Sequence, residues 1–138
     1  MATKQVIVIR KDLKMRRGKE IAQGAHASIK FLVDRIKEHV STGGSSDTWD
    51  ERPIDFMRFS DAEKEWMEGL FKKVCLQVNS EDELIGIYMA AKKAGLETHL
   101  ITDSGLTEFN GVPTKTCLAI GPDEESKIDE ITGKLSLY

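Results

Sequence analysis

The sequence lacks the cysteine and histidine clusters that build covalent or metal-bound frameworks. Its 138 residues include two cysteines, Cys75 and Cys117, which lie far apart in apolar runs with no Cys-x-x-Cys pair. His26, His39 and His99 show no metal-like spacing. We therefore predict no metal site and no cofactor. We interpret both cysteines as small buried hydrophobic residues of a protein in a reducing compartment.

Long hydrophobic runs are also missing. No apolar stretch is long enough to span a membrane, and the short run at residues 6–9 leads into a charged loop, unlike a signal peptide. The chain is 40% hydrophobic and 31% charged, which is typical of a soluble globular protein. We predict one cytoplasmic domain over residues 1–138, with no membrane contact. The sequence leaves a homodimer open.

An overall excess of positive charge is absent too, because the formal net charge is −3. The first nineteen residues nevertheless carry seven positive charges and one negative charge, a local sum of +6, so the rest of the chain sums to −9. This asymmetry indicates either a phosphate-binding face on an acidic body or a solvated basic loop.

Hydrophobic periodicity and capping signals predict four strands and four helices. The expected strands span residues 5–10, 73–78, 98–102 and 115–120, and the helices follow residue 18, the capping boxes at 60–63 and 80–83, and Pro122. The order β-α-α-β-α-β-β-α predicts an α/β domain with a four-stranded mixed sheet and helices on both faces. The short link 103–114 allows its two flanking strands to be antiparallel.

The first helix, residues 18–40, carries two stripes. Its apolar positions are Ile21, Ala25, Ile29, Leu32, Ile36 and Val40, and its polar positions are Lys19, Gln23, His26 and Lys30. Residues 42–58 are rich in Gly, Ser and Asp and are predicted to be a loop insertion. In the helix after Ser60, we expect Trp66, Met67 and Leu70 to face inward.

The loop before the first helix, LKMRRGK, ends in a Gly-Lys pair like that of a phosphate loop. A Walker A loop would need Gly at position 13 and Ser or Thr at position 20, which hold Leu13 and Glu20 instead, so this nucleotide site is excluded. A more general feature remains, because a basic loop leads into a helix N-terminus that favours an anion.

A second candidate site is the segment Asp103-Ser-Gly-Leu-Thr107, which follows a predicted strand. Open α/β sheets place their sites at strand ends, but the same residues also suit a turn in which Asp103 caps backbone N–H groups. A dehalogenase-type nucleophile would need a second Asp at position 105, where Gly105 stands. No Gly-x-Ser-x-Gly motif supports serine catalysis, and His26 remains a core histidine, a base or a ligand.

Three segments together resemble the type 2 peptidyl-tRNA hydrolases of archaea and eukaryotes. They are VIVIRKDLKMRRGKEIAQGAHAS, LITDSGLTEF and CLAIGPDEESKIDEITGKLSLY. The first is similar to the family's opening, with Asp-Leu-Lys-Met, Gly-Lys, Ala-Gln and Ala-His-Ala. The second is similar to its Asp-Ala-Gly-Arg-Thr segment, and the third to its closing Gly-Pro and Thr-Gly-x-Leu. The resemblance covers about residues 4–40 and 60–138.

The resemblance implies a metal-free hydrolase that cleaves the ester of peptidyl-tRNA or another N-blocked aminoacyl-tRNA. The catalytic residues would be Lys19, His26, Asp103 and Thr107. Asp103 would orient or deprotonate the water, Thr107 would hydrogen-bond substrate or Asp103, and Lys19 would stabilise the oxyanion or the terminal phosphate. Gln23 and His26 would position the 3′ end. Phosphates of tRNA would be bound by Lys11, Lys14, Arg16 and Arg17.

Two positions depart from the family's pattern, since Ser104 replaces its Ala and Leu106 replaces its Arg. A lost Arg could weaken a contact to RNA or to a carboxylate. The alternative is therefore a catalytically inactive adaptor of the same fold that binds RNA or a protein. Retention of Lys19, Asp103 and Thr107 favours the enzyme.

Overall fold

The computed structural model describes residues 1–42 and 58–138, whose strands form one four-stranded sheet. The strands are β1 (Thr3–Arg10), β2 (Lys73–Val78), β3 (Thr98–Asp103) and β4 (Thr114–Glu124), in the spatial order β2-β1-β4-β3. β1 and β2 run parallel, and β4 pairs antiparallel with both β1 and β3. The predicted mixed sheet is confirmed, and so is the antiparallel pair at its end.

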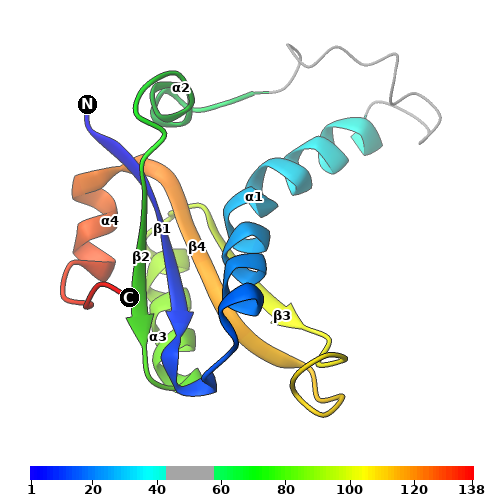
Figure 1. The fold of residues 1–138 in the computed structure, drawn as a ribbon. Coiled ribbons are helices and arrows are strands. Elements are labelled where there is room, and N and C mark those ends of the chain that lie inside the picture. The colour runs from blue at the N-terminus through cyan, green and yellow to red at the C-terminus, as the bar shows by residue number, and fades with distance from the viewer. Residues whose placement is uncertain (43–57) are drawn as a thin grey trace.

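Helices cover both faces of this sheet (Figure 1). They are α1 (Arg17–Thr42), α2 (Asp61–Glu68), α3 (Glu81–Lys93) and α4 (Glu125–Thr132), and a 3-10 turn, η1 (Lys11–Leu13), follows β1. The view has α1 in front of the sheet and α3 behind it. The predicted element order is confirmed. No helix in the described part of the chain has the length and apolarity needed to span a membrane.

The core lies on the two faces of β1, whose side chains alternate. Val6 and Val8 pack with Leu84 of α3 and Ile128 of α4. The neighbouring residues Ile7 and Ile9 pack on the opposite face, with Ala27 of α1 and Cys117 of β4 in the same cluster. A strand buried on both faces explains why residues 5–9 are hydrophobic or uncharged without alternation.

Several local predictions are confirmed and others are wrong. Ser60 and Glu63 form the complete capping box expected at the start of α2. Pro122 does not open a helix, because β4 continues through it to Glu124 and α4 begins at Glu125. Leu70 does not face inward: it follows the end of α2 and is exposed. The predicted insertion 42–58 lies outside the described residues except at its two ends.

The apolar stripe of α1 does not face the sheet. The buried positions are Gln23, Ala27 and Phe31, whereas Ile21 and Ile29 are 68% and 53% exposed. The reason is that α1 packs over β3 and β4 and leaves the α1 side of β2 uncovered. The expectation of a buried Cys75 on β2 is therefore wrong, because its thiol is exposed, whereas Cys117 is buried.

A groove of about 810 Å³ occupies the uncovered part of the sheet. Its lining is mostly apolar and comes from α1, α2, β1, β2 and the C-terminus, including Ile7, Ile21, Ala25, Trp66, Phe71 and Tyr138. Glu20, which accepts a hydrogen bond from the Tyr138 hydroxyl, and Lys73 are its charged members. The stripe recognised in the sequence thus lines a surface groove rather than the core.

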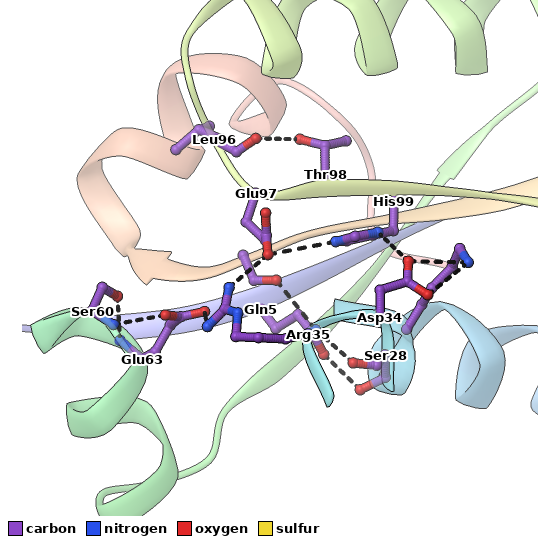
Figure 2. Close-up of polar contacts among 12 residues, drawn as sticks. Gln5, Ser28, Asp34, Arg35, Ser60, Glu63, Leu96, Glu97, Thr98 and His99 are labelled. Atoms are coloured by element: carbon purple, nitrogen blue, oxygen red, sulfur yellow. Dashed lines mark hydrogen bonds and ion pairs between the residues drawn. The ribbon is translucent and has the colours of Figure 1, made fainter. Parts of the chain in front are cut away.

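A polar network ties α1 to α2 and to the beginning of β3 (Figure 2). The Arg35 guanidinium donates to Glu63 of α2 and to Glu97 before β3, both at 2.7 Å. His99, 3.6 Å from Glu97, and then Arg35 hold the pKa of the Glu97 carboxyl below its usual value. Glu63 is buried, so its charge depends on Arg35 for compensation.

We expect Arg35→Met to lower the free energy of unfolding by about 2–3 kcal/mol, because it leaves the buried Glu63 carboxylate without its partner. Urea unfolding followed by circular dichroism at pH 7 measures this change. Lys72→Met is the matched control, since it removes one lysine from an exposed pair with Glu125, 2.6 Å away, and should cost less than about 1 kcal/mol. Equal losses in both variants would contradict the role given to Arg35.

Candidate functional site

Asp103, the last residue of β3, lies against the first turn of α1. Its carboxylate oxygen Oδ1 accepts a hydrogen bond from the Lys19 ammonium at 2.8 Å. The same ammonium donates to the Thr107 hydroxyl oxygen at 3.0 Å. Side chains that are 84 and 88 positions apart from Lys19 thus meet at one nitrogen atom. The structure brings together three of the four residues predicted as catalytic.

Gln23 holds the same carboxylate from one helical turn further along α1. Its side-chain nitrogen donates to Asp103 Oδ1 at 3.2 Å, and its side-chain oxygen accepts a hydrogen bond from the Thr116 hydroxyl of β4. The side chain is only 1% exposed, so both polar atoms need these protein partners. Gln23 therefore holds the Asp103 carboxylate from the buried side, while Lys19 contacts it from the side nearer the protein surface.

The turn after β3 supplies a further donor to Asp103. The backbone N–H of Gly105 donates to the second carboxylate oxygen, Oδ2, at 2.8 Å. Gly105 has a φ of +81°, and a Cβ atom there would lie 2.2 Å from the carbonyl oxygen of Val112, so a side chain does not fit. The turn interpretation of this segment is therefore confirmed, because Asp103 caps a backbone N–H group, and the same carboxylate also contacts Lys19.

These contacts fix the charge of the pair. The hydrogen bond from Lys19, assisted by the N–H of Gly105 and by Gln23, holds the pKa of Asp103 below its usual value. Both side chains keep limited contact with water, with 15% of Lys19 and 12% of Asp103 exposed. The Asp103 carboxyl is therefore ionised near neutral pH.

His26 is the predicted catalytic residue that stands apart from the cluster. It is exposed on α1, about one turn beyond Gln23, and within the described residues it makes no hydrogen bond to Lys19, Asp103 or Thr107. It lines a groove between α1 and β3 instead. The core interpretation of this histidine is wrong, and a role in binding is compatible with its place.

The predicted phosphate-binding residues surround the beginning of α1. Lys11 is in η1, Lys14 follows it with a φ of 50°, and Arg16 and Arg17 lead into the helix. All four are exposed. Arg16 donates to Glu108 at 2.7 Å, so a carboxylate from the turn after β3 already balances part of the positive charge.

Sequence reasoning missed the residues that support the cluster from β4 and from the turn. Thr116 orients Gln23, and the ring of Phe109 lies 5.9 Å from the Lys19 ammonium. Neither carries a local motif, because each acts through a contact with a residue far away in the sequence. Within residues 1–42 and 58–138, no group of three or more His, Cys, Asp and Glu side chains is placed to hold a metal ion.

Comparison with known proteins places these residues in a family. Residues 3–138 match the family model described as Peptidyl-tRNA hydrolase PTH2. The chain belongs to this family. It is 44% identical over 135 residues to a peptidyl-tRNA hydrolase of Methanothermobacter thermautotrophicus, covering 97% of this chain and 98% of that protein. It is 40% identical over 134 residues to one of Methanocaldococcus jannaschii, again covering 97% and 98%.

Membership in the PTH2 family confirms the resemblance inferred from the three segments. A peptidyl-tRNA hydrolase of Haloquadratum walsbyi is also similar, at 39% identity over 98% of this chain and 99% of that protein. Such coverage leaves no separate additional domain in these relatives. The match includes Lys19, Asp103 and Thr107, which form the hydrogen-bonded cluster at the end of β3.

Proposed function

We propose that this protein hydrolyses the ester bond between the peptide and the tRNA of peptidyl-tRNA, at the cluster of Lys19, Asp103 and Thr107. The observation that carries the proposal is the single Lys19 ammonium that donates to both Asp103 and Thr107 in a chain of the PTH2 family. The products are a peptide carboxylate and a tRNA with a free 3′-terminal hydroxyl. This releases tRNA left blocked by stalled translation.

The number of hydrogen bonds that the Asp103 carboxylate accepts leaves a place for an attacking water molecule. A carboxylate accepts about four hydrogen bonds. Asp103 receives three from the protein, from Lys19, Gln23 and Gly105, which leaves room for one water molecule. Because its pKa is lowered, Asp103 is a weak base, and its main role is to hold the water in line with the ester carbonyl. It would take a proton from the water as the water oxygen attacks, and return it to the ribose oxygen as that oxygen leaves.

Lys19 would act on the carbonyl oxygen of the ester, while Asp103 acts on the water. An ammonium has three N–H donors, and two of them are used by Asp103 and Thr107. The third would donate to the carbonyl oxygen as negative charge develops on it, so that the bond to the ribose oxygen can break. Thr107 fixes the rotation of the ammonium. Gln23 positions Asp103, and the exposed His26 is assigned to substrate binding beside the ester.

The alternative of an inactive adaptor finds no support in these comparisons, since the similar proteins carry the name of the enzyme. The proposal needs no metal, because water, a carboxylate and an ammonium suffice for an activated ester. It places the protein in the cytoplasm, where translation produces the substrate. The free thiols of Cys75 and Cys117 agree with a reducing compartment.

The Asp103→Asn variant should fold normally and lose about 100-fold or more in kcat on N-acetyl-aminoacyl-tRNA, because an amide holds the water less strongly and no longer pairs with Lys19. Lys19→Ala should also lower kcat. The matched control is Asp129→Asn, which removes a carboxylate from another lysine pair, with Lys4 at 2.6 Å, and should leave turnover unchanged. Release of the labelled amino acid is measured under single-turnover conditions. Near-normal turnover by folded Asp103→Asn would reduce Asp103 to a turn residue.

Phosphate binding by the basic residues can be tested with two adjacent arginines. Arg17→Ala should raise KM for the tRNA substrate and lessen the slope of log KM against log salt by roughly 1, because it removes one phosphate contact. Arg16→Ala should have a smaller effect, since Glu108 already balances that charge. Neither change should lower kcat greatly. Steady-state kinetics at several salt concentrations check this. An unchanged KM for both variants at low salt would mean a merely solvated loop.

The proposal includes a homodimer formed at the apolar groove between α1 and β2. A twofold interface must be complementary to itself, and this groove combines exposed apolar residues with one residue of each charge, Glu20 and Lys73. We expect Ile21→Glu to convert the dimer into a monomer, whereas Met89→Glu, an equivalent change on the opposite face, should not. Sedimentation velocity distinguishes these outcomes. A wild-type monomer at micromolar concentration would contradict the dimer.

A further inference from the structure

A second groove, of about 520 Å³, begins beside the catalytic cluster and follows α1 away from it. At its near end are His26, one turn beyond Gln23, and Thr102, the residue before Asp103. Its apolar floor includes the side chains of Ile29, Val33 and Ile101, whereas Leu100, which also lines the groove, packs on the opposite face of the sheet. Lys30, Asp34 and Lys37 lie along the groove on α1. The groove therefore continues the site along the space between one helix and one strand.

The strand in this groove is an edge strand. β3 is last in the order β2-β1-β4-β3, and its only strand partner within the described ranges is β4. Alternate backbone N–H and C=O groups of an edge strand point away from its partner and can pair with another extended chain. Such pairing recognises the main chain of a peptide and tolerates many side chains.

The position of the cluster separates two arms of the substrate. The basic residues Lys14 and Arg16 lie before α1, Arg17 is its first residue, and Lys19 is in its first turn. The groove lies further along the same helix, from His26 to Lys37. An ester held at Lys19 has a polynucleotide on one side and an acyl chain on the other. If the basic residues hold phosphates, the acyl chain extends toward the groove.

The lining of the groove fits a peptide better than single-stranded RNA. Stacking of bases on aromatic rings is a main contribution to binding of single strands. Apart from the imidazole of His26, no aromatic side chain in the described part of the chain lines this groove. One of its lysines, Lys30, is already paired with Asp34 at 3.2 Å. An apolar floor beside an edge strand instead suits an extended peptide.

We propose that the peptide arm of peptidyl-tRNA binds in the α1–β3 groove as an extended chain, with its backbone along the edge of β3 and its side chains against Val33 and Ile101. This inference rests on the proposed function, since it deepens the assignment of the same site. Main-chain pairing and an apolar floor would select for peptide length rather than for particular residues.

The test compares two substrates made on the same tRNA, N-acetyl-aminoacyl-tRNA and an N-acetyl-tetrapeptidyl-tRNA with the same C-terminal residue. For the wild-type protein we expect kcat/KM to be about 10-fold higher with the tetrapeptide, as one or two net hydrogen bonds would give. Val33→Glu should bring this ratio close to one, because a carboxylate on the floor opposes the peptide. Met89→Glu, on α3 behind the sheet, is the matched control and should keep the wild-type ratio.

Pairing of the peptide backbone with β3 can be tested separately by changing the substrate. An N-methyl group on an internal amide of the tetrapeptide removes one donor and keeps the side chains, and at least one of the internal positions should lower kcat/KM several-fold. The ratio of two substrates on one enzyme preparation does not depend on the folded fraction, so a less stable Val33→Glu protein still gives a valid result.

Other outcomes would overturn the inference. Equal losses on both substrates in Val33→Glu would indicate that the groove holds RNA. A wild-type ratio near one, or no loss on either substrate in Val33→Glu, would mean that no peptide binds there. Insensitivity to N-methylation at every internal position would exclude pairing with β3. Failure of the wild-type protein to cleave either substrate would instead refute the proposed hydrolase function, which is a distinct result.

Discussion

Two ion pairs hold α1 against β3, and the site depends on both. Near the start of the helix, Lys19 pairs with Asp103 at the end of the strand, at 2.8 Å. Further along the helix, Arg35 pairs with Glu97 just before the strand, at 2.7 Å. The helix and the strand therefore run in opposite directions and are joined near Lys19 and near Arg35. The groove that begins at His26 lies mostly between these two attachments, and Lys37 lies just beyond the second.

Because of this arrangement, α1 does not bury its apolar stripe against the sheet. A helix on a sheet commonly buries its apolar stripe. Here the helix turns Gln23 toward the sheet, where Thr116 and Asp103 satisfy its amide. Ile21 and Ile29 then remain exposed beside the uncovered strand β2. The position of the Lys19–Asp103 pair thus leaves apolar surface unburied, which the proposed self-association would remove from water.

Local features of the sequence predicted the elements well, because their signals lie within a few residues of each other. The strand at 73–78 and the Ser60 capping box are examples. Pro122 misled because proline commonly opens helices, but here the long pairing of β4 with β1 extends the strand past it. The face of α1 that is buried could not be predicted, since it depends on which strands the helix covers.

The candidate site was predictable only as two separate segments. Composition suggested a basic loop before a helix, and Asp103 suggested a strand end or a turn. The resemblance to the family joined the two segments, and the structure shows the hydrogen bonds between them. Thr116 could not be found, because its hydroxyl acts on Gln23 from 93 positions away and leaves no periodic pattern. The Arg16–Glu108 pair is hidden for the same reason, so the local charge of the loop was overestimated.

Leu106 stands where the resemblance to the family implies an Arg, and its exposed position favours an effect of this exchange on binding rather than on the chemistry. Leu106 is 84% exposed, at a position whose side chain points away from the turn's interior. The turn is held by the Gly105 N–H on Asp103 and by Thr107 on Lys19, and neither bond involves the side chain of residue 106. An arginine at this exposed position could contact RNA without changing the carboxylate. Its loss therefore leaves the hydrogen bonds of the Lys19–Asp103 cluster in place, and any effect should be on substrate affinity, where the neighbouring lysines and arginines also act.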